Sequence, residues 1–81
     1  MRPITVHHSR YKSVQAHLLQ LRVASGLTQV ELAERLKVDQ SRVSKIERGE
    51  RYVDVLFYLD WCRACEVDPA QAVAQLAEMG A

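Results

Sequence analysis

A short run of polar side chains begins at residue 40, and its residue types and spacing could place several hydrogen-bond donors and acceptors on one surface. The run consists of Gln40, Ser41, Ser44, Lys45 and Arg48. At this spacing the five residues share one side of an α-helix. Amide, hydroxyl and ammonium groups match the donors and acceptors on base edges in the major groove, and the cations also suit the neighbouring phosphates. The pattern therefore predicts a helix that presents a nucleic-acid-binding face.

The residues around this face predict where its helix begins, ends and packs. Asp39 stands where a carboxylate can accept the first free N–H groups of a helix. Gly49 stands where a helix ends. Val43 and Ile46 fall on the opposite side, so they are expected to point into the core. The segment is therefore predicted to be a short amphipathic helix with its polar side outward.

A second short helix is expected directly before the first, across a tight turn. Thr28 and Glu31 have the spacing of a capping box, in which each side chain accepts a backbone N–H of the other residue. The inner face of this helix is predicted to be Val30, Leu32, Ala33 and Leu36. The turn spans residues 36–38, and its middle position often requires a positive φ, where glycine is easier than Lys37.

Three more helices are predicted from the apolar pattern and from the residues that end helices. The first covers 9–25 and ends at Gly26; its apolar stripe is Tyr11, Val14, Leu18 and Leu21. The fourth covers about 54–65, with a stripe of Val55, Leu56, Leu59 and Cys62. The fifth covers about 69–79, where Asp68 caps the helix and Pro69 takes its first position.

The predicted fold class is all-α, a compact five-helix bundle that contains a helix-turn-helix. We expect residues 9–81 to form one domain and residues 1–8 to form a flexible N-terminal arm. A chain of 81 residues allows one small domain. Such a domain buries only about 60% of the surface that its unfolded chain exposes, so it is marginally stable on its own. Dimerisation is a usual supplement.

Charge is divided unevenly along the chain, although the net charge is only +1. Residues 1–52 carry ten Lys or Arg against five Asp or Glu, a net charge of +5. Residues 53–81 carry one Arg against five Asp or Glu, a net charge of −4. This division suggests that the first part faces a polyanion and that the second part faces away from it.

The cysteines and histidines do not form a recognisable chemical site. Cys62 and Cys65 have the spacing of a redox motif, but they fall late in a predicted helix, whereas a helix N-terminus is what stabilises a thiolate. We interpret them as core residues with free thiols. His7, His8 and His17 do not match the paired spacing of a zinc site. With no set of nucleophile and base either, we expect no enzyme activity, no cofactor and no metal.

The start of the chain, MRPITVHH, lacks the apolar run of a signal peptide. No segment approaches the length of a membrane span. We therefore expect a cytoplasmic protein that does not contact a membrane, in a compartment that keeps thiols reduced.

Many spaced positions between residues 18 and 68 agree in type and order with one known pattern. They are Arg22, Gly26-Leu27-Thr28-Gln29, Glu31-Leu32-Ala33, Val38, Val43-Ser44, Glu47 and Gly49. In these positions the chain resembles the phage repressor and Cro type of helix-turn-helix protein, the XRE family, with its lambda-repressor-like DNA-binding domain. The chain departs from the family at Lys37, where glycine is common.

The resemblance implies a role for each matching or neighbouring position. Base contacts would come from Gln40, Ser41, Ser44 and Lys45. Phosphate contacts would come from Gln29, Arg42, Arg48 and Arg51. In the resembling proteins the counterparts of Arg22 and Glu47 form a structural salt bridge that joins the first helix to the third, and Gln29 can also brace Gln40.

Two functions are consistent with the sequence. The first is a sequence-specific transcriptional regulator, a repressor that binds a palindromic operator in double-stranded DNA as a homodimer. Its dimer interface is predicted at Phe57, Trp61, Val73, Leu76 and Met79. The alternative is a protein-interaction module of the same fold, an antitoxin or antiactivator that sequesters a partner protein. Salt-dependent binding to random duplex DNA separates the two, because phosphate contacts release counterions.

Overall fold

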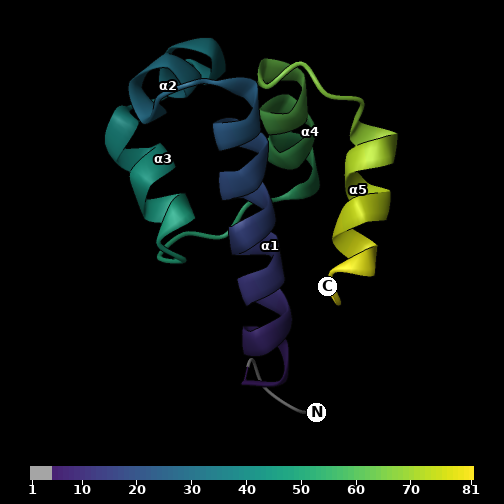
Figure 1. The fold of residues 1–81 in the computed structure, drawn as a ribbon. Helices are drawn as coiled ribbons and strands as arrows, with labels where there is room; N and C mark the ends of the chain where they lie inside the picture. The colour runs from purple at the N-terminus through teal and green to yellow at the C-terminus, as the bar shows by residue number, and fades with distance from the viewer. Residues whose placement is uncertain (1–4) are drawn as a thin grey trace.

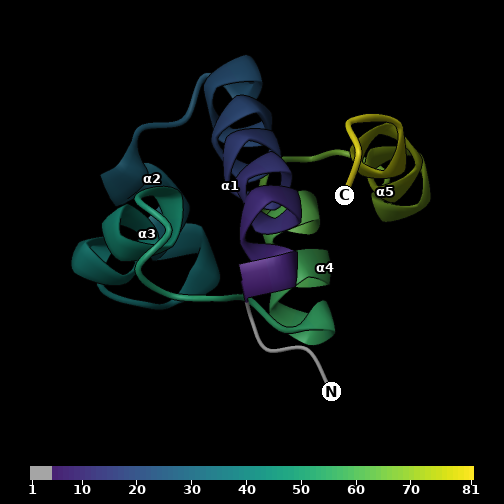
Figure 2. The same cartoon turned by 90° about the horizontal axis from the view of Figure 1, so that it is seen from below.

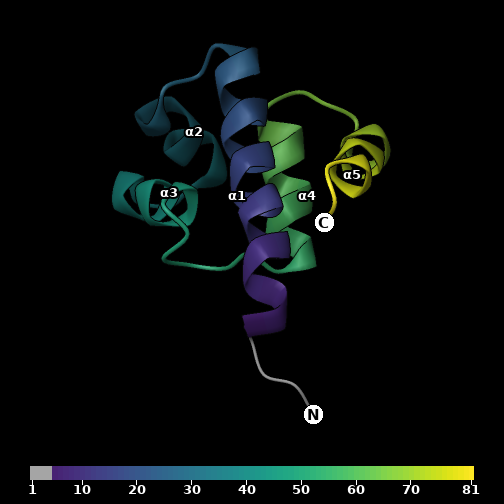
Figure 3. The same cartoon turned by 60° about the horizontal axis from the view of Figure 1, so that its bottom comes forward.

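The computed structural model describes residues 5–81, and these residues form five α-helices and no strand (Figure 1). The helices are α1 (Thr5–Ser25), α2 (Gln29–Leu36), α3 (Gln40–Glu47), α4 (Val55–Ala64) and α5 (Pro69–Glu78). The long helix α1 runs through the middle of the molecule, with α2 and α3 on one side (Figure 1). Helix α4 lies beside α1, and α5 is outermost on the other side (Figure 3). The predicted five-helix bundle is confirmed.

Three of the helix starts are fixed by capping side chains, and the sequence predicted two of these caps, at Thr28 and at Asp68. The Thr28 hydroxyl accepts the Glu31 N–H at 3.1 Å, and the Glu31 carboxylate accepts the Thr28 N–H at 2.9 Å, which completes the capping box. Asp54 caps α4 by accepting the Phe57 N–H at 2.8 Å, and Asp68 caps α5. These bonds satisfy N–H groups that have no partner inside the helix.

The cap predicted for α3 is wrong. Asp39 occupies the N-cap position in extended backbone, but its carboxylate makes no capping hydrogen bond. The reason is that the Arg42 N–H, which the carboxylate would accept, is donated to the backbone carbonyl of Asp39 at 3.0 Å. The start of α3 therefore depends on a backbone turn and on packing.

Helix α1 begins four residues before its predicted start at residue 9. The segment from Thr5 to Ser9 holds neither proline nor glycine, so nothing in it interrupts the helix once α1 has formed. Residues 5–8, which we assigned to a flexible arm, are therefore helical in their backbone. The rest of that predicted arm, residues 1–4, lies outside the described residues.

The core is made where α1, α2, α3 and α4 meet. Its most deeply buried side chains are His17, Leu18, Leu32, Val43, Ile46, Trp61 and Cys62. The Trp61 indole N–H donates to the Leu18 carbonyl at 3.1 Å, so its one polar group has a partner. Burial of these apolar groups provides the main stabilising free energy of the fold.

The predicted inner faces of two helices are partly wrong. The predicted Cys62 is buried and the predicted Leu59 is half-buried, but Val55 and Leu56 of α4 are 74% and 73% exposed. The helix turns Tyr58 and Trp61 inward in their place. The aromatic side chains bury more area than the aliphatic ones that they displace from the core. Val30 of α2 is also exposed, and only its predicted neighbours Leu32, Ala33 and Leu36 are buried or half-buried.

Candidate nucleic-acid interface

Helix α3 presents a polar face to solvent. Gln40, Ser41 and Lys45 are exposed and Ser44 is half-buried, whereas Val43 and Ile46 on the other side of the helix are buried. Helix α2 packs against α3, and Lys37 between them adopts the left-handed conformation, with φ of 60° and ψ of 44°. All four residues assigned to base contacts therefore lie on one short helix, and three of them are open to a ligand.

An ion pair joins α1 to α3 beneath this face. The Arg22 Nε donates to Glu47 Oε2 at 2.7 Å and Arg22 Nη2 donates to Glu47 Oε1 at 3.1 Å. Arg22 Nη1 also donates to the Leu27 carbonyl at 2.8 Å. The Glu47 side chain is only 5% exposed. A two-point guanidinium–carboxylate contact fixes geometry as well as charge, so it holds α3 at a set angle to α1.

Two glutamines continue this network from the ion pair to the surface. Gln29 Nε2 donates to Glu47 Oε1 at 2.8 Å, and Gln40 Nε2 donates to Gln29 Oε1 at 2.8 Å. Gln29 is half-buried at the start of α2, and Gln40 is exposed at the start of α3. The contact between Gln29 and Gln40 that the resemblance implies is therefore present in the structure.

Arg48 is held by a neighbouring carboxylate at the end of α3. Its Nε and Nη2 donate to the two Glu50 oxygens at 2.9 Å and 3.2 Å, and its Nη1 donates to the Ser44 hydroxyl oxygen at 2.5 Å. The hydrogen bond from Arg48 lowers the pKa of Glu50 below its ordinary value. Both side chains of the pair are about half exposed, so a phosphate can displace Glu50 at little cost.

Arg42 packs on α4 instead of extending into solvent. Its guanidinium carbon lies 4.9 Å from the centre of the Phe57 ring, a cation–π contact. Its Nε is buried and has no hydrogen-bond partner among the described residues. Arg42, Lys37, Lys45 and Arg51 line one surface hollow of about 490 Å³, together with the Asp39 carboxylate. The excess of positive charge suits an anion such as a backbone phosphate.

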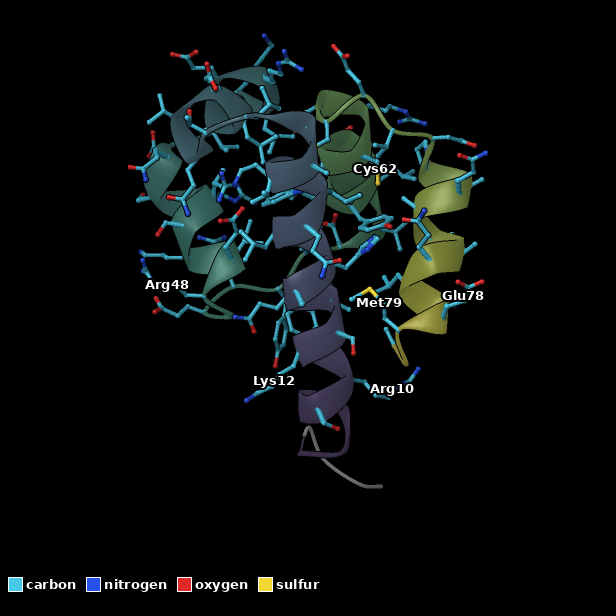
Figure 4. All side chains as sticks on the ribbon, viewed as in Figure 1. Arg10, Lys12, Arg48, Cys62, Glu78 and Met79 are labelled. Atoms are coloured by element: carbon cyan, nitrogen blue, oxygen red, sulfur yellow. The ribbon has the colours of Figure 1, made fainter. Side chains whose placement is uncertain are left out.

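Sequence reasoning missed Lys37 as part of this basic hollow. We treated it only as an unusual turn residue, although a cation beside a polar helix was a signal of a phosphate contact. Arg48, which the sequence did predict as a phosphate contact, lies on the outer side of α3, across α1 from Glu78 and Met79 at the end of α5 (Figure 4).

The residues predicted for a dimer interface divide into three groups. Trp61 is fully buried inside the chain, so that assignment is wrong: a side chain enclosed by its own core cannot contact a second copy. Phe57 and Leu76 are half-buried, and Phe57 lies under Arg42. Val73 and Met79 are 49% and 36% exposed.

An apolar groove lies close to these residues, between α1, α4 and α5. It encloses about 550 Å³, and its lining residues are Tyr11, Val14, Val53, Asp54, Val55, Tyr58, Leu59, Pro69, Ala70, Val73 and Leu76. Asp54 is the one charged residue among them. Viewed from below, α5 and α3 lie on opposite sides of α1, so the groove and the polar face of α3 are well separated (Figure 2).

Cys62 and Cys65 are buried and unbonded to each other. Burial raises the pKa of both thiols, which disfavours the reactive thiolate at neutral pH. Among the side chains that the structure describes, those of residues 9–81, no three His, Cys, Asp or Glu groups gather as a metal ion would require. None of the helices in the described part of the chain is both long and apolar enough to cross a bilayer.

An exposed polar helix, held by a second short helix across a tight turn, defines a helix-turn-helix domain. Comparison with known proteins supports the same class of domain. Residues 16–79 match the family model of a helix-turn-helix domain. The chain is similar to an XRE-family like protein from Pseudomonas syringae pv. tomato str. DC3000, with 43% sequence identity and a TM-score of 0.84, over 95% of this chain and 94% of that one.

Two other solved structures share the fold. The clp gene regulator ClgR from C. glutamicum is 26% identical, with a TM-score of 0.77 over 99% of this chain and 97% of that one. The restriction-modification controller protein C.Esp1396I is 24% identical, with a TM-score of 0.77 over 83% of this chain and 88% of that one. A comparison with curated proteins gave no significant match. The chain belongs to the XRE family of helix-turn-helix DNA-binding regulators.

Proposed function

We propose that this protein is a transcriptional repressor that binds a palindromic operator as a homodimer and reads the major groove with α3. The observation that carries the proposal is the exposure of Gln40, Ser41 and Lys45 on a helix whose angle is fixed by the Arg22–Glu47 ion pair. A rigid polar helix loses little conformational entropy on binding, so its contacts are available for recognition. A bound dimer that covers a promoter blocks transcription by occupancy alone.

In this proposal the contacts divide into two kinds. Gln40, Ser41, Ser44 and Lys45 contact bases, where Lys45 suits the acceptors O6 and N7 of guanine. Gln29, Arg42, Arg48 and Arg51 contact phosphates, which supply affinity and position. Lys37 joins the second group because it lines the same basic hollow as Arg42 and Arg51.

The dimer surface is proposed at the apolar groove and its rim. Val55 and Val73, which line the groove, leave 74% and 49% of their area exposed there. A second copy seated on this face buries those side chains and leaves α3 free, because α3 lies across α1 (Figure 2). The controller protein C.Esp1396I, which has the same fold, is a tetramer in complex with its natural 35 base-pair operator.

The direct test is selection of binding sites from random duplex DNA with the purified full chain. We expect an enriched site of two inverted half-sites spaced about one turn of DNA apart. Gln40→Ala should relax the preference at one position in each half-site. Arg48→Ala should instead weaken binding to all sequences alike and reduce the dependence of affinity on salt. Recovery of no enriched sequence by the wild-type protein would contradict the proposal.

The second candidate function, a module that sequesters a partner protein, is supported by the same groove. An apolar groove of this size suits a helix or a peptide of another protein as well as a second copy. The two candidates differ in the selection experiment. A module without DNA function would bind duplex DNA weakly, without sequence preference, and with one salt dependence for all sequences.

A further inference from the structure

We propose that Glu47, although buried, determines which base Gln40 prefers, because it fixes the orientation of the Gln40 amide through Gln29. The inference rests on the proposed function, in which Gln40 contacts a base. It starts from one continuous network of four side chains, Arg22, Glu47, Gln29 and Gln40, with donor–acceptor distances of 2.7 to 3.1 Å. The network runs from the inside of the domain to the polar face of α3.

The direction of every hydrogen bond in this network follows from the chemistry of its buried end. Glu47 is the partner of a guanidinium, and a carboxylate can only accept hydrogen bonds. Gln29 must therefore turn its NH2 group toward Glu47, which leaves its oxygen facing Gln40. An amide oxygen can also only accept, so Gln40 must turn its own NH2 group toward Gln29. The observed bonds have these directions.

The consequence for recognition is a fixed pattern on the exposed side of Gln40. One of its N–H groups is used by Gln29, so one acceptor oxygen and one N–H remain for a base. Adenine presents the matching pair in the major groove, a donor at N6 and an acceptor at N7. Guanine presents two acceptors, O6 and N7, and the Gln40 oxygen would face one of them. The network therefore favours adenine over guanine at this position.

A glutamine without such support discriminates less strongly between adenine and guanine. Its amide can rotate by half a turn and offer the NH2 group in place of the oxygen, which suits guanine better. Anchoring by Glu47 and Gln29 opposes that rotation. Glu47 thus acts as a positioning residue for base preference, in addition to holding α3 against α1.

The test uses Gln29→Met in the full chain. Binding is measured by titration on two DNAs: the selected operator, and a copy that has guanine in place of adenine at the position contacted by Gln40. That position is the one whose preference disappears in Gln40→Ala. Methionine keeps the length of the side chain but has no hydrogen-bonding amide, and the Thr28–Glu31 capping box remains. The matched control is Gln20→Met, at an exposed position of α1.

We expect the wild-type protein and the control to prefer adenine by about 5- to 150-fold, the range for a bidentate pair. Gln29→Met should reduce that ratio to about twofold or less, with preferences at the other positions unchanged. In the double variant Gln29→Met with Gln40→Ala, the first change should have no further effect at this position, as expected for coupled residues.

A separate variant, Glu47→Gln, supplies a group that can donate as well as accept, so it no longer imposes one direction on the network. A folded Glu47→Gln protein should also lose the preference for adenine. If this variant does not fold, the inference is tested by the adenine-to-guanine ratio of Gln29→Met. If Gln29→Met weakens binding to both DNAs by the same factor and leaves the ratio intact, the inference is wrong and Gln29 only contacts a phosphate. If the wild-type protein selects no sequence at all, the proposed function fails instead.

Discussion

At the scale of single residues, the side chains described for residues 9–81 include two buried polar ones, Glu47 and His17, and each is matched to a partner. Glu47 is 9% exposed and receives hydrogen bonds from Arg22 and Gln29. His17 is 2% exposed, and its Nε2 lies 2.8 Å from the Tyr58 hydroxyl. Sequence patterning alone could not place His17 in the core, because a histidine on a helix is as readily exposed as buried. Its partner is 41 residues away in the chain.

The burial of His17 predicts a pH dependence of stability. Burial lowers the pKa of His17 below its ordinary value of 6.5, so the native state disfavours its protonation. Below pH 6.5 the unfolded chain binds the proton more readily, and the free energy of unfolding falls as the pH falls. The pKa values of Glu31 and Glu50 are lowered from 4.5, so these carboxylates lose their stabilising effect only at lower pH.

We therefore expect urea unfolding between pH 7 and pH 5 to show a loss of stability of up to about 1.4 kcal/mol per pH unit from this one residue. His17→Gln, which keeps an amide for Tyr58, should lack that component, whatever its stability at pH 7. Equal slopes for the wild type and the variant over this range would show that His17 does not titrate with unfolding.

At the scale of elements, the helices that were predicted best are those with signals at both ends. Helix α2 has the Thr28–Glu31 capping box and α5 has Asp68 before Pro69, and both begin where expected. The side of α4 that faces the core was predicted less well. Its sequence is apolar on several sides, so only the packing of Tyr58 and Trp61 against α1 decides which side is buried.

In the candidate site, too, some features could be predicted from the sequence and others could not. The polar face of α3 follows from helical spacing, and the Arg22–Glu47 pair follows from the family resemblance. The contact between Arg42 and Phe57 and the pairing of Arg48 with Glu50 depend on side-chain rotamers and on neighbouring helices. These features arise from tertiary packing, which a linear pattern does not contain.

The turn between α2 and α3 gives a prediction in which stability and binding change in opposite directions. Lys37 has φ of 60°, a conformation that strains a residue with a Cβ atom. Lys37→Gly should raise the free energy of unfolding by about 0.5–1 kcal/mol. It also removes a cation from the basic hollow, so it should weaken binding to all DNA sequences. Thermal unfolding and titration with duplex DNA measure the two effects.

Glu66 offers a matched control for this change. It has φ of 61° after α4, away from the basic hollow, so Glu66→Gly should stabilise the protein similarly without weakening DNA binding. A loss of affinity in both variants would mean that the effect comes from a change in the fold, and not from the charge of Lys37.

At the scale of the whole molecule, the two surfaces for which a function is proposed lie on opposite sides of α1. The basic and polar surface is built on α2 and α3, and the apolar groove lies between α1, α4 and α5 (Figures 1 and 2). This arrangement agrees with the division of charge along the chain, where residues 1–52 are basic and residues 53–81 are acidic. In the proposed function, the acidic residues of 53–81, which repel DNA, are kept away from the DNA-contacting surface, and the apolar groove is left free for association between copies.

This arrangement predicts that oligomerisation can be removed without unfolding the domain. Val55 is 74% exposed at the first position of α4 and lines the groove, so Val55→Asp places a charge in the proposed dimer contact at a helix start that tolerates an acid. We expect sedimentation to show a monomer, with loss of most of the affinity for the two-half-site operator and with unchanged binding to a single half-site. Val23→Asp, at a position that is 60% exposed on α1 and outside the groove, should remain dimeric. A dimer of the Val55→Asp protein, or equal behaviour of the two variants, would place the contact between copies elsewhere on the molecule.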